Sequence, residues 1–493
     1  MDANPPSPSE PLAVPPRSEA RRAVAALVIT ISAALLAGMT LRMPTQITAN
    51  DISRYCTVWS LLERGTYAID DCPWQKETQD KVRKPEPGST ASPPPVRTYS
   101  SKPPLLATLM AGILYPARRL TGVPLDAVVE QPRIPRNVEQ ADPARPGQTR
   151  AVVETPPPIR WPAYIFYFKP LILAFNLVPQ VVFLVLFARL LDRYAANDWA
   201  WFASLVAAAF GTLLCNFAAS LNNHSLAASS TFFALYALIG ILDAPDGRTR
   251  ARRFAALGFW AGFAACNEIP AGLLGLTMFG FAAARSPRLA GLAFVPAALV
   301  PLAAFFATQY LAFGQFRPVY EEFGTKSYNY EGSYWLTPLE FDYFNKFPET
   351  KPIYLFHMTF GHHGIFSLTP IFLFSLYAMI RNTFGRDRPL RGVSALTLVL
   401  TVAMLAFYTW NPKARNYGGT TSGLRWLFWL IPAWLVVLPT GLAGGQDRRW
   451  ARVLFLISLA VSGLTVGYAL RNPWSNPWIV DLLEHLDLYP LVR

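Results

Sequence analysis

Long apolar runs, separated by short polar stretches, recur along most of this chain. About eleven such runs stand out, and charged residues are nearly absent from them. Runs of about 20 uncharged residues are typical of membrane-spanning segments, which must be helical because lipid offers peptide groups no other hydrogen-bond partner. The sequence therefore predicts an all-α polytopic membrane protein with about 11 transmembrane helices. We expect them near residues 23–43, 164–191, 199–221, 225–242, 254–266, 271–284, 289–313, 364–380, 393–410, 424–441 and 453–470.

Composition and charge agree with this interpretation. Charged residues make up 15% of the chain and hydrophobic residues 52%, whereas a soluble domain carries about 25% charged residues. The formal net charge of +13 comes largely from arginines in loops. Basic residues concentrate in cytoplasmic loops, so these clusters predict a cytoplasmic N-terminus and exclude a nucleic-acid surface. They lie near residues 189–193, 248–253, 285–288, 381–391 and 448–452.

This topology divides the chain into three parts. Residues 1–20 are predicted to be a disordered cytoplasmic tail, residues 21–470 a transmembrane domain and residues 471–493 an external tail. Two long external loops follow from it, over residues 44–160 and 314–363.

The first external loop has structure of its own. Residues 51–64 place apolar side chains on one face, as an amphipathic helix at a membrane surface does. Residues 105–120 predict a second such helix, for which a membrane span is the alternative. Residues 120–160 are rich in proline and charge, which predicts a flexible insertion. Cys56 and Cys72 share this loop, and either a disulfide or buried free thiols would fit.

Two features of this loop carry chemistry. Asp51 opens it, and Ser101-Lys102-Pro103-Pro104-Leu105 precedes its second amphipathic stretch. A carboxylate can take a proton from an acceptor hydroxyl, and a lysine can hold a phosphate as a point charge. The structural alternatives are that Asp51 caps the helix that follows and that Lys102 anchors the chain at the interface.

The order of these motifs resembles the GT-C superfamily of glycosyltransferases that use polyprenyl-phosphate sugars. It looks closest to the protein mannosyltransferase and aminoarabinose transferase branch. Asn50-Asp51 stands where that family often has Asp-Glu or Asp-Asp, and Ser101 replaces the glutamate before the lysine. The resemblance implies transfer of a sugar, with inversion, from a lipid carrier to an acceptor, with Asp51 as general base and Lys102 at the carrier phosphate.

The resemblance also implies partners and a location. Membrane lipids, a polyprenyl-phosphate carrier and a glycan, lipid or protein acceptor are expected, with no nucleic acid. The polyprenyl-phosphate-linked sugar would be the donor substrate, with no cofactor required. The expected location is the bacterial inner membrane, with the active site facing the periplasm. An oligosaccharide ligase or polymerase, or a non-catalytic transporter or scaffold, remains the alternative.

Further polar residues near the ends of the predicted spans are candidates for the same site. Arg54 and Arg425 are candidates for the carrier phosphate, since both lie on the external side; Arg425 follows a glycine-containing stretch that permits close backbone approach. His357, together with His362 and His363, invites a metal interpretation, but no acidic residue stands at a telling spacing, so no metal site is predicted. Possible substrate-binding residues are Tyr55, Asn223, His224, Glu268, His362, His363 and Tyr417.

Overall fold

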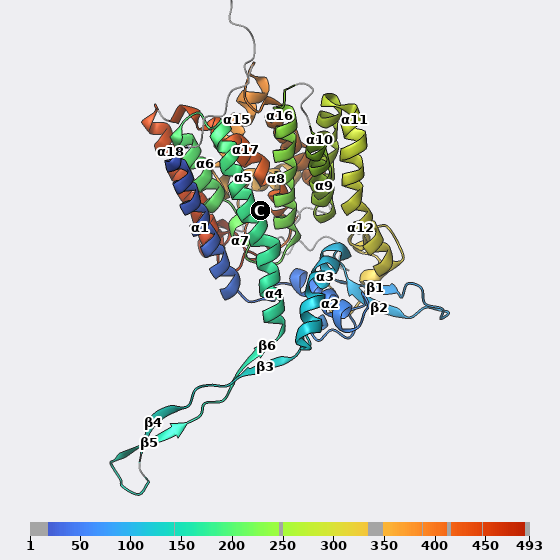
Figure 1. Cartoon of the computed structure of the whole chain (residues 1–493), viewed down its shortest axis with the longest axis vertical. Coiled ribbons are helices and arrows are strands. Elements are labelled where there is room, and N and C mark those ends of the chain that lie inside the picture. The colour runs from blue at the N-terminus through green and yellow to red at the C-terminus, as the bar shows by residue number, and fades with distance from the viewer. Residues whose placement is uncertain are drawn as a thin grey trace, which may run out of the picture.

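The computed structural model describes residues 18–141, 143–245, 250–333, 349–386, 388–411, 416–445 and 447–488. Its helices form a bundle, and the first loop lies at one end of that bundle (Figure 1). The helices are α1 (Glu19–Arg42), α2 (Ala49–Glu63), α3 (Pro104–Thr121), α4 (Tyr164–Ile172), α5 (Val178–Tyr194), α6 (Asp198–Phe210), α7 (Leu214–Phe217), α8 (Asn223–Leu242), α9 (Ala251–Asn267), α10 (Ala271–Arg285), α11 (Pro287–Leu289), α12 (Val295–Phe313), α13 (Lys351–Thr359), α14 (Ile365–Leu368), α15 (Phe372–Phe384), α16 (Arg391–Trp410), α17 (Ile431–Gly441), α18 (Arg449–Tyr468) and α19 (Trp478–His485).

Each apolar run predicted from the sequence is helical over most of its length. Six helices of the described chain are long and apolar enough to cross a membrane, and three shorter apolar helices accompany them. The protein is therefore mostly helical, with the character of a polytopic membrane protein, while the count of about eleven spans stays a prediction. The six cover Glu19–Arg42, Tyr164–Tyr194, Asn223–Leu242, Pro287–Phe313, Arg391–Trp410 and Arg449–Tyr468.

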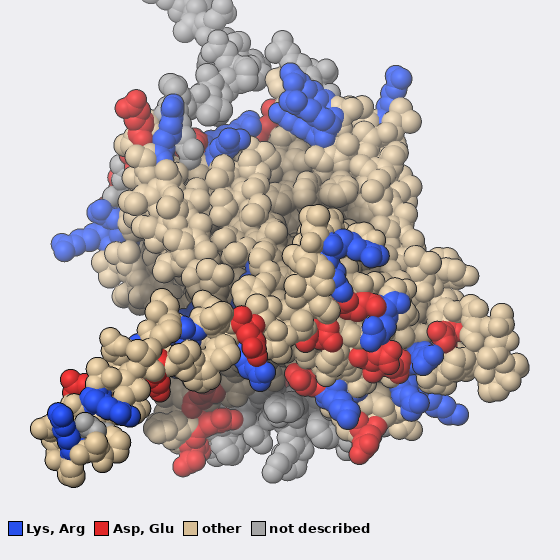
Figure 2. Space-filling model, turned by 60° about the horizontal axis from the view of Figure 1, so that its bottom comes forward, with Lys and Arg blue, Asp and Glu red and all other residues tan. Residues whose placement is uncertain are grey.

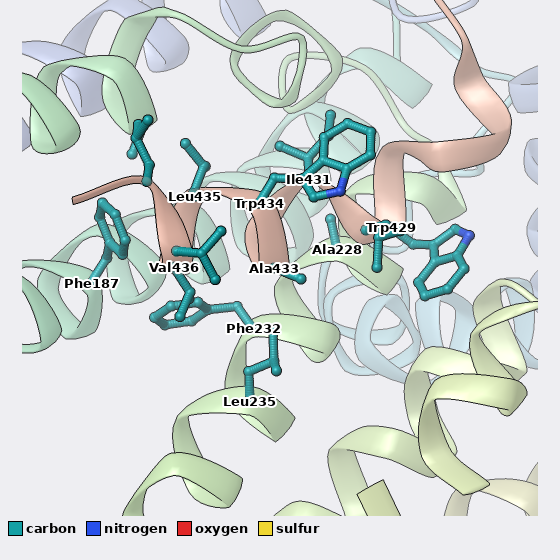
Figure 3. Close-up of a cluster of buried hydrophobic side chains, with 14 of the residues drawn as sticks. Phe187, Ala228, Phe232, Leu235, Trp429, Ile431, Ala433, Trp434, Leu435 and Val436 are labelled. Atoms are coloured by element: carbon teal, nitrogen blue, oxygen red, sulfur yellow. The ribbon is translucent and has the colours of Figure 1, made fainter. Parts of the chain in front are cut away.

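Large apolar side chains fill the centre of the bundle. Figure 3 shows α17 with Trp434, Leu435 and Val436 next to Phe187 of α5 and Phe232 of α8. All five side chains are at most 2% exposed. Because α17 is buried on all sides, it acts as the central element around which the other helices pack.

The surface divides into a charge-poor band and two charged ends. Figure 2 shows a broad band with few Lys, Arg, Asp or Glu residues between the blue residues at the upper edge and mixed red and blue residues on the lower part. Apolar side chains such as Leu276, Val300 and Ile457 are more than half exposed on the helices. A surface of this kind suits hydrocarbon rather than water.

Arginines from three of the predicted clusters, near residues 189–193, 248–253 and 285–288, lie together at one end of the bundle. Arg193 at the end of α5 pairs with Asp243 after α8 at 2.8 Å, and Arg285 at the end of α10 donates to the carbonyl of Ala244 at 2.5 Å. Arg21 of α1 links to the same region through Asp192 of α5 at 4.0 Å. The assignment of this end to the cytoplasm stays a prediction.

The first loop folds against the opposite end. α2 and α3 pack together there, and Tyr55 and Trp59 of α2 share a buried cluster with Met110 of α3 and Phe168 of α4. α3 is not among the six long apolar helices, and its placement at a membrane surface stays a prediction. Cys56, which faces this cluster from α2, is a buried free thiol.

Strands occupy parts of the loop where the sequence predicted none. Four strands within residues 120–160 pair two by two and project from the bundle (Figure 1), while the flexibility expected for this insertion stays a prediction. Cross-strand ion pairs such as Arg136–Glu154 and Arg160–Glu130 account for part of the difference, because opposite charges facing each other stabilise a strand pair. The pairs are β1 (Lys81–Pro85) with β2 (Val96–Ser100), β3 (Val128–Gln131) with β6 (Ile159–Pro162), and β4 (Arg136–Ala141) with β5 (Thr149–Glu154).

Candidate active site

The N-terminus of α2 holds Asp51 in a capping box. Thr48 is the N-cap, and the Asp51 carboxylate accepts the backbone N–H groups of Thr48 at 2.9 Å and Ile52 at 2.8 Å through Oδ1. Oδ2 accepts the Ile47 N–H at 3.0 Å. The predicted structural alternative for Asp51, a helix cap, is therefore present, while Oδ2 keeps capacity to accept a second hydrogen bond.

Burial sets the protonation of Asp51. The side chain is fully buried, which raises its pKa to about 7 even though backbone N–H groups at the cap lower it. A carboxyl group with a pKa near neutrality can exist in both protonation states at physiological pH, as proton transfer requires.

One turn along α2, Arg54 lies at the centre of the candidate site. Its guanidinium hydrogen-bonds to the side chain of Asn50 and donates to Asn223 Oδ1 at 2.8 Å. Burial lowers the pKa of Arg54 to about 10. Three carboxylates lie close enough to oppose that shift: those of Asp80, Asp51 and Glu268.

Asn223, His224 and Glu268 come together where α8 begins and α9 ends. Asn223 Nδ2 donates to Glu268 Oε1 at 2.7 Å and to the carbonyl of Asn267 at 2.8 Å. His224 Nδ1 contacts the same Glu268 oxygen. Asn223 therefore bridges Arg54 to Glu268, and three residues that the sequence selected separately form one network.

Lys102 joins the site through a residue that sequence reasoning missed. Its Nζ lies 3.0 Å from Asp80 Oδ2, and burial lowers the Lys102 pKa, against the opposing effect of Asp80. Asp80 immediately precedes β1, whose partner β2 ends at Ser100. A hairpin pattern across residues 81–100 was the signal that would have placed Asp80 beside the lysine.

Arg425 approaches from the other half of the chain. Its guanidinium lies 4.9 Å from the centre of the Trp474 ring, a cation–π distance. Its charge lowers the pKa of both Arg54 and Lys102, so the three cations act on one region. The tight turn before Arg425 depends on Gly418, whose φ is +102°. A Cβ added at Gly418 would lie only 2.7 Å from the Cβ of Arg425, so the close approach of the backbone here requires glycine.

A small cavity opens beside these groups. It has a volume of ≈ 20 Å³, and its lining includes Arg54 and Asn223 together with the apolar Leu105, Phe263 and Cys266. A cavity of this size holds water rather than a sugar, so a larger ligand requires the lining to move. A lining that combines polar and apolar residues suits an amphipathic ligand.

The remaining candidates lie elsewhere. Tyr55 is fully buried, stacks on Phe168 with ring centres 4.0 Å apart, and belongs to the core between α2 and α4. His362 and His363 form a second cluster with Tyr417, whose ring lies 4.3 Å from that of His363. Glu349, which the sequence did not single out, accepts a hydrogen bond from the Tyr417 hydroxyl there.

The apolar helices and these contacts together define a helical, membrane-type protein. Its buried site of mixed charge lies at the end of the bundle opposite the arginine clusters.

No protein-family model matches the chain, and no curated protein matches it. One solved structure that it resembles is the crystal structure of the Archaeoglobus fulgidus oligosaccharyltransferase in complex with zinc and sulfate, at 11% sequence identity and a TM-score of 0.43. The alignment covers 91% of this chain and 53% of the archaeal chain, so this chain spans about half of that enzyme's length.

Proposed function

We propose that this protein is a membrane glycosyltransferase that moves a sugar from a polyprenyl-phosphate carrier to a glycan, lipid or protein acceptor on the non-cytoplasmic face. The observation that carries the proposal is the convergence of three cations, Arg54, Lys102 and Arg425, beside buried carboxylates and a partly apolar cavity. Cations at the headgroup level suit a lipid-linked phosphate, and neighbouring carboxylates suit proton removal from a hydroxyl. A bacterial inner membrane, with the site facing the periplasm, is the location that fits this chemistry.

The phosphate would take the place of a carboxylate beside the lysine. Lys102 pairs with Asp80 at 3.0 Å, so the incoming phosphate would compete with Asp80 for the ammonium group. Arg54 is held by Asn50 and Asn223, which fixes its direction before substrate arrives. A preorganised cation stabilises the leaving phosphate more than a mobile one does, because little reorganisation remains at the moment of reaction.

Asp51 is our assignment for the general base. Its pKa of about 7 matches the task at neutral pH. Full burial means that the acceptor hydroxyl reaches Oδ2 only when the N-terminal turn of α2 or its neighbours move. Glu268 is the competing carboxylate, because it lies next to the cavity-lining residues Asn223 and Asn267. The proposed transfer requires no cofactor.

Sugar transfer by the purified protein tests the assignment. Asp51→Asn keeps the shape of the side chain and one oxygen for the helix cap, so the protein should remain folded. It removes the base, so transfer should fall by about 10²–10⁴-fold. Thr48→Ala is the matched control, because it weakens the same cap and removes one long contact to Oδ1, at 3.4 Å, but leaves the carboxylate itself in place. A comparable loss in Thr48→Ala would reduce Asp51 to a structural role. Full activity in Asp51→Asn, with loss in Glu268→Gln, would move the base to Glu268.

A further inference from the structure

A second buried cluster lies outside the proposed glycosyl-transfer site. Glu349 precedes α13, His357 lies in its last turn and His362 follows in the next loop. One ligand atom from each residue lies within 4.8 Å of the other two, and His362 Nε2 is 3.9 Å from Glu349 Oε1. The three residues are 8%, 3% and 2% exposed. Gly361 permits this closeness, because a Cβ there would overlap the His357 ring.

A surrounding layer of residues orients these ligand atoms. His362 Nδ1 lies 2.5 Å from His363 Nδ1, and the opposite ring nitrogen, Nε2, faces Glu349. The Tyr417 hydroxyl donates to Glu349 Oε2, which leaves Oε1 on the side of His362. Metal-binding histidines and carboxylates are commonly held by hydrogen bonds of this kind.

We propose that Glu349, His357 and His362 form a binding site for a divalent metal ion, with zinc as the ion that this donor set suits. Two histidines and one carboxylate make a three-ligand zinc set that leaves a fourth position open. Bonds of about 2.0–2.1 Å in a tetrahedron place ligand atoms about 3.4 Å apart, so binding draws the cluster together slightly. Glu349 is the acidic partner that the sequence spacing of the histidines did not reveal.

The site has a structural consequence that does not depend on sugar transfer. It joins the segment that leads into α13 to the loop before α14. Tyr417 connects that unit to the next turn, because its carbonyl accepts the Arg425 N–H at 3.2 Å and its own N–H donates to the Tyr354 hydroxyl at 3.3 Å. A bound ion therefore also restrains the turn that carries Arg425.

Cobalt binding by the purified, full-length, metal-stripped protein tests the proposal. Co²⁺ is a spectroscopic substitute for Zn²⁺, and we expect one equivalent per chain, visible ligand-field bands of a four-coordinate ion and displacement of those bands by Zn²⁺. A wild-type protein that binds no Co²⁺ or Zn²⁺ at micromolar concentration overturns the proposal, whatever the variants do.

Variants identify the ligands. Glu349→Gln and His357→Asn should each weaken Co²⁺ binding by about 100-fold or more, and Tyr417→Phe, which removes only a supporting hydrogen bond, by about 10–100-fold. His485→Asn is the control, since that histidine is exposed on α19 and should leave binding unchanged. Size-exclusion profiles without metal show whether each variant folds. If the two ligand variants misfold, unchanged affinity in Tyr417→Phe overturns the site; unchanged affinity in folded ligand variants does so directly.

Discussion

The two buried polar clusters of this protein differ in charge. The first brings the cations Arg54 and Lys102 together with the carboxylates of Asp80 and Glu268 at the end of the bundle. The second is built from imidazole, phenol and one carboxylate, with His363 stacked on Tyr417. Charges taken out of water are stable only while each has a partner, whereas neutral rings pack like other aromatic side chains.

That difference indicates different ligands. A site with fixed charges of both signs can exchange an internal partner for a charged substrate, as when a phosphate replaces Asp80 beside Lys102. A cluster of imidazole nitrogens with one carboxylate suits a small cation. The two clusters are connected at Arg425, whose backbone bonds to Tyr417 of the second cluster while its charge acts on the first.

The largest expected effect follows removal of the central cation. Arg54→Met removes a buried positive charge that attracts nearby carboxylates and leaves Asn50 and Asn223 without their donor, so the free energy of unfolding should fall by about 3–5 kcal/mol. His363→Phe keeps a ring that can stack on Tyr417 and should cost clearly less. Denaturant unfolding of the protein in detergent micelles measures both values.

Arg64→Met is the control for this comparison, since Arg64 ends the same helix with its side chain 53% exposed. It should change stability by no more than about 1 kcal/mol. Equal losses in Arg54→Met and His363→Phe would remove the distinction between a charged and a neutral cluster.

The pH dependence of the first cluster is the next effect in size. If ionised Asp51 is the base, transfer should fall about tenfold per pH unit below its pKa of about 7. Stability should change in the opposite direction. Between pH 4 and 7 the folded protein keeps a proton that the unfolded chain has lost, because the pKa is raised from 3.8 on folding. The Asp51 contribution to stability is therefore fully present below pH 4 and is lost as the pH rises through 7.

Asp51→Asn should abolish this stability slope, since asparagine does not titrate. The measurement is the free energy of unfolding at several pH values for wild type and variant. Parallel slopes in the two proteins would mean that Asp51 does not carry the proton.

The sequence predicted the helices far better than the clusters. Long apolar runs such as residues 289–313 specify helices by themselves, because lipid or a buried core leaves no alternative for the backbone. Asp51, Lys102 and Arg54 were also predicted for one site from their loop. Asp80 and Glu349 were not. Asp80 comes beside Lys102 only when the hairpin of β1 and β2 is recognised, and Glu349 joins its cluster only when α13 is placed in space.

The smallest effect tests how the two clusters are joined. Gly418 has a φ of +102°, and an added Cβ would lie 2.8 Å from Arg425 Nε. Gly418→Ala should therefore cost about 1–2 kcal/mol in stability from backbone strain alone and also displace Arg425.

Gly65→Ala is the matched control, because its φ is +70° and nothing lies within 4 Å of the added carbon. Both variants place an alanine at a positive φ, but only Gly418→Ala brings a carbon against Arg425, so a difference in carrier affinity between them reports the displacement of Arg425. We expect affinity for a polyprenyl-phosphate analogue to fall about tenfold in Gly418→Ala, as loss of one charge-assisted contact would give, and to be unchanged in Gly65→Ala. Equal affinities would separate Arg425 from the carrier phosphate and leave that role to Arg54 and Lys102.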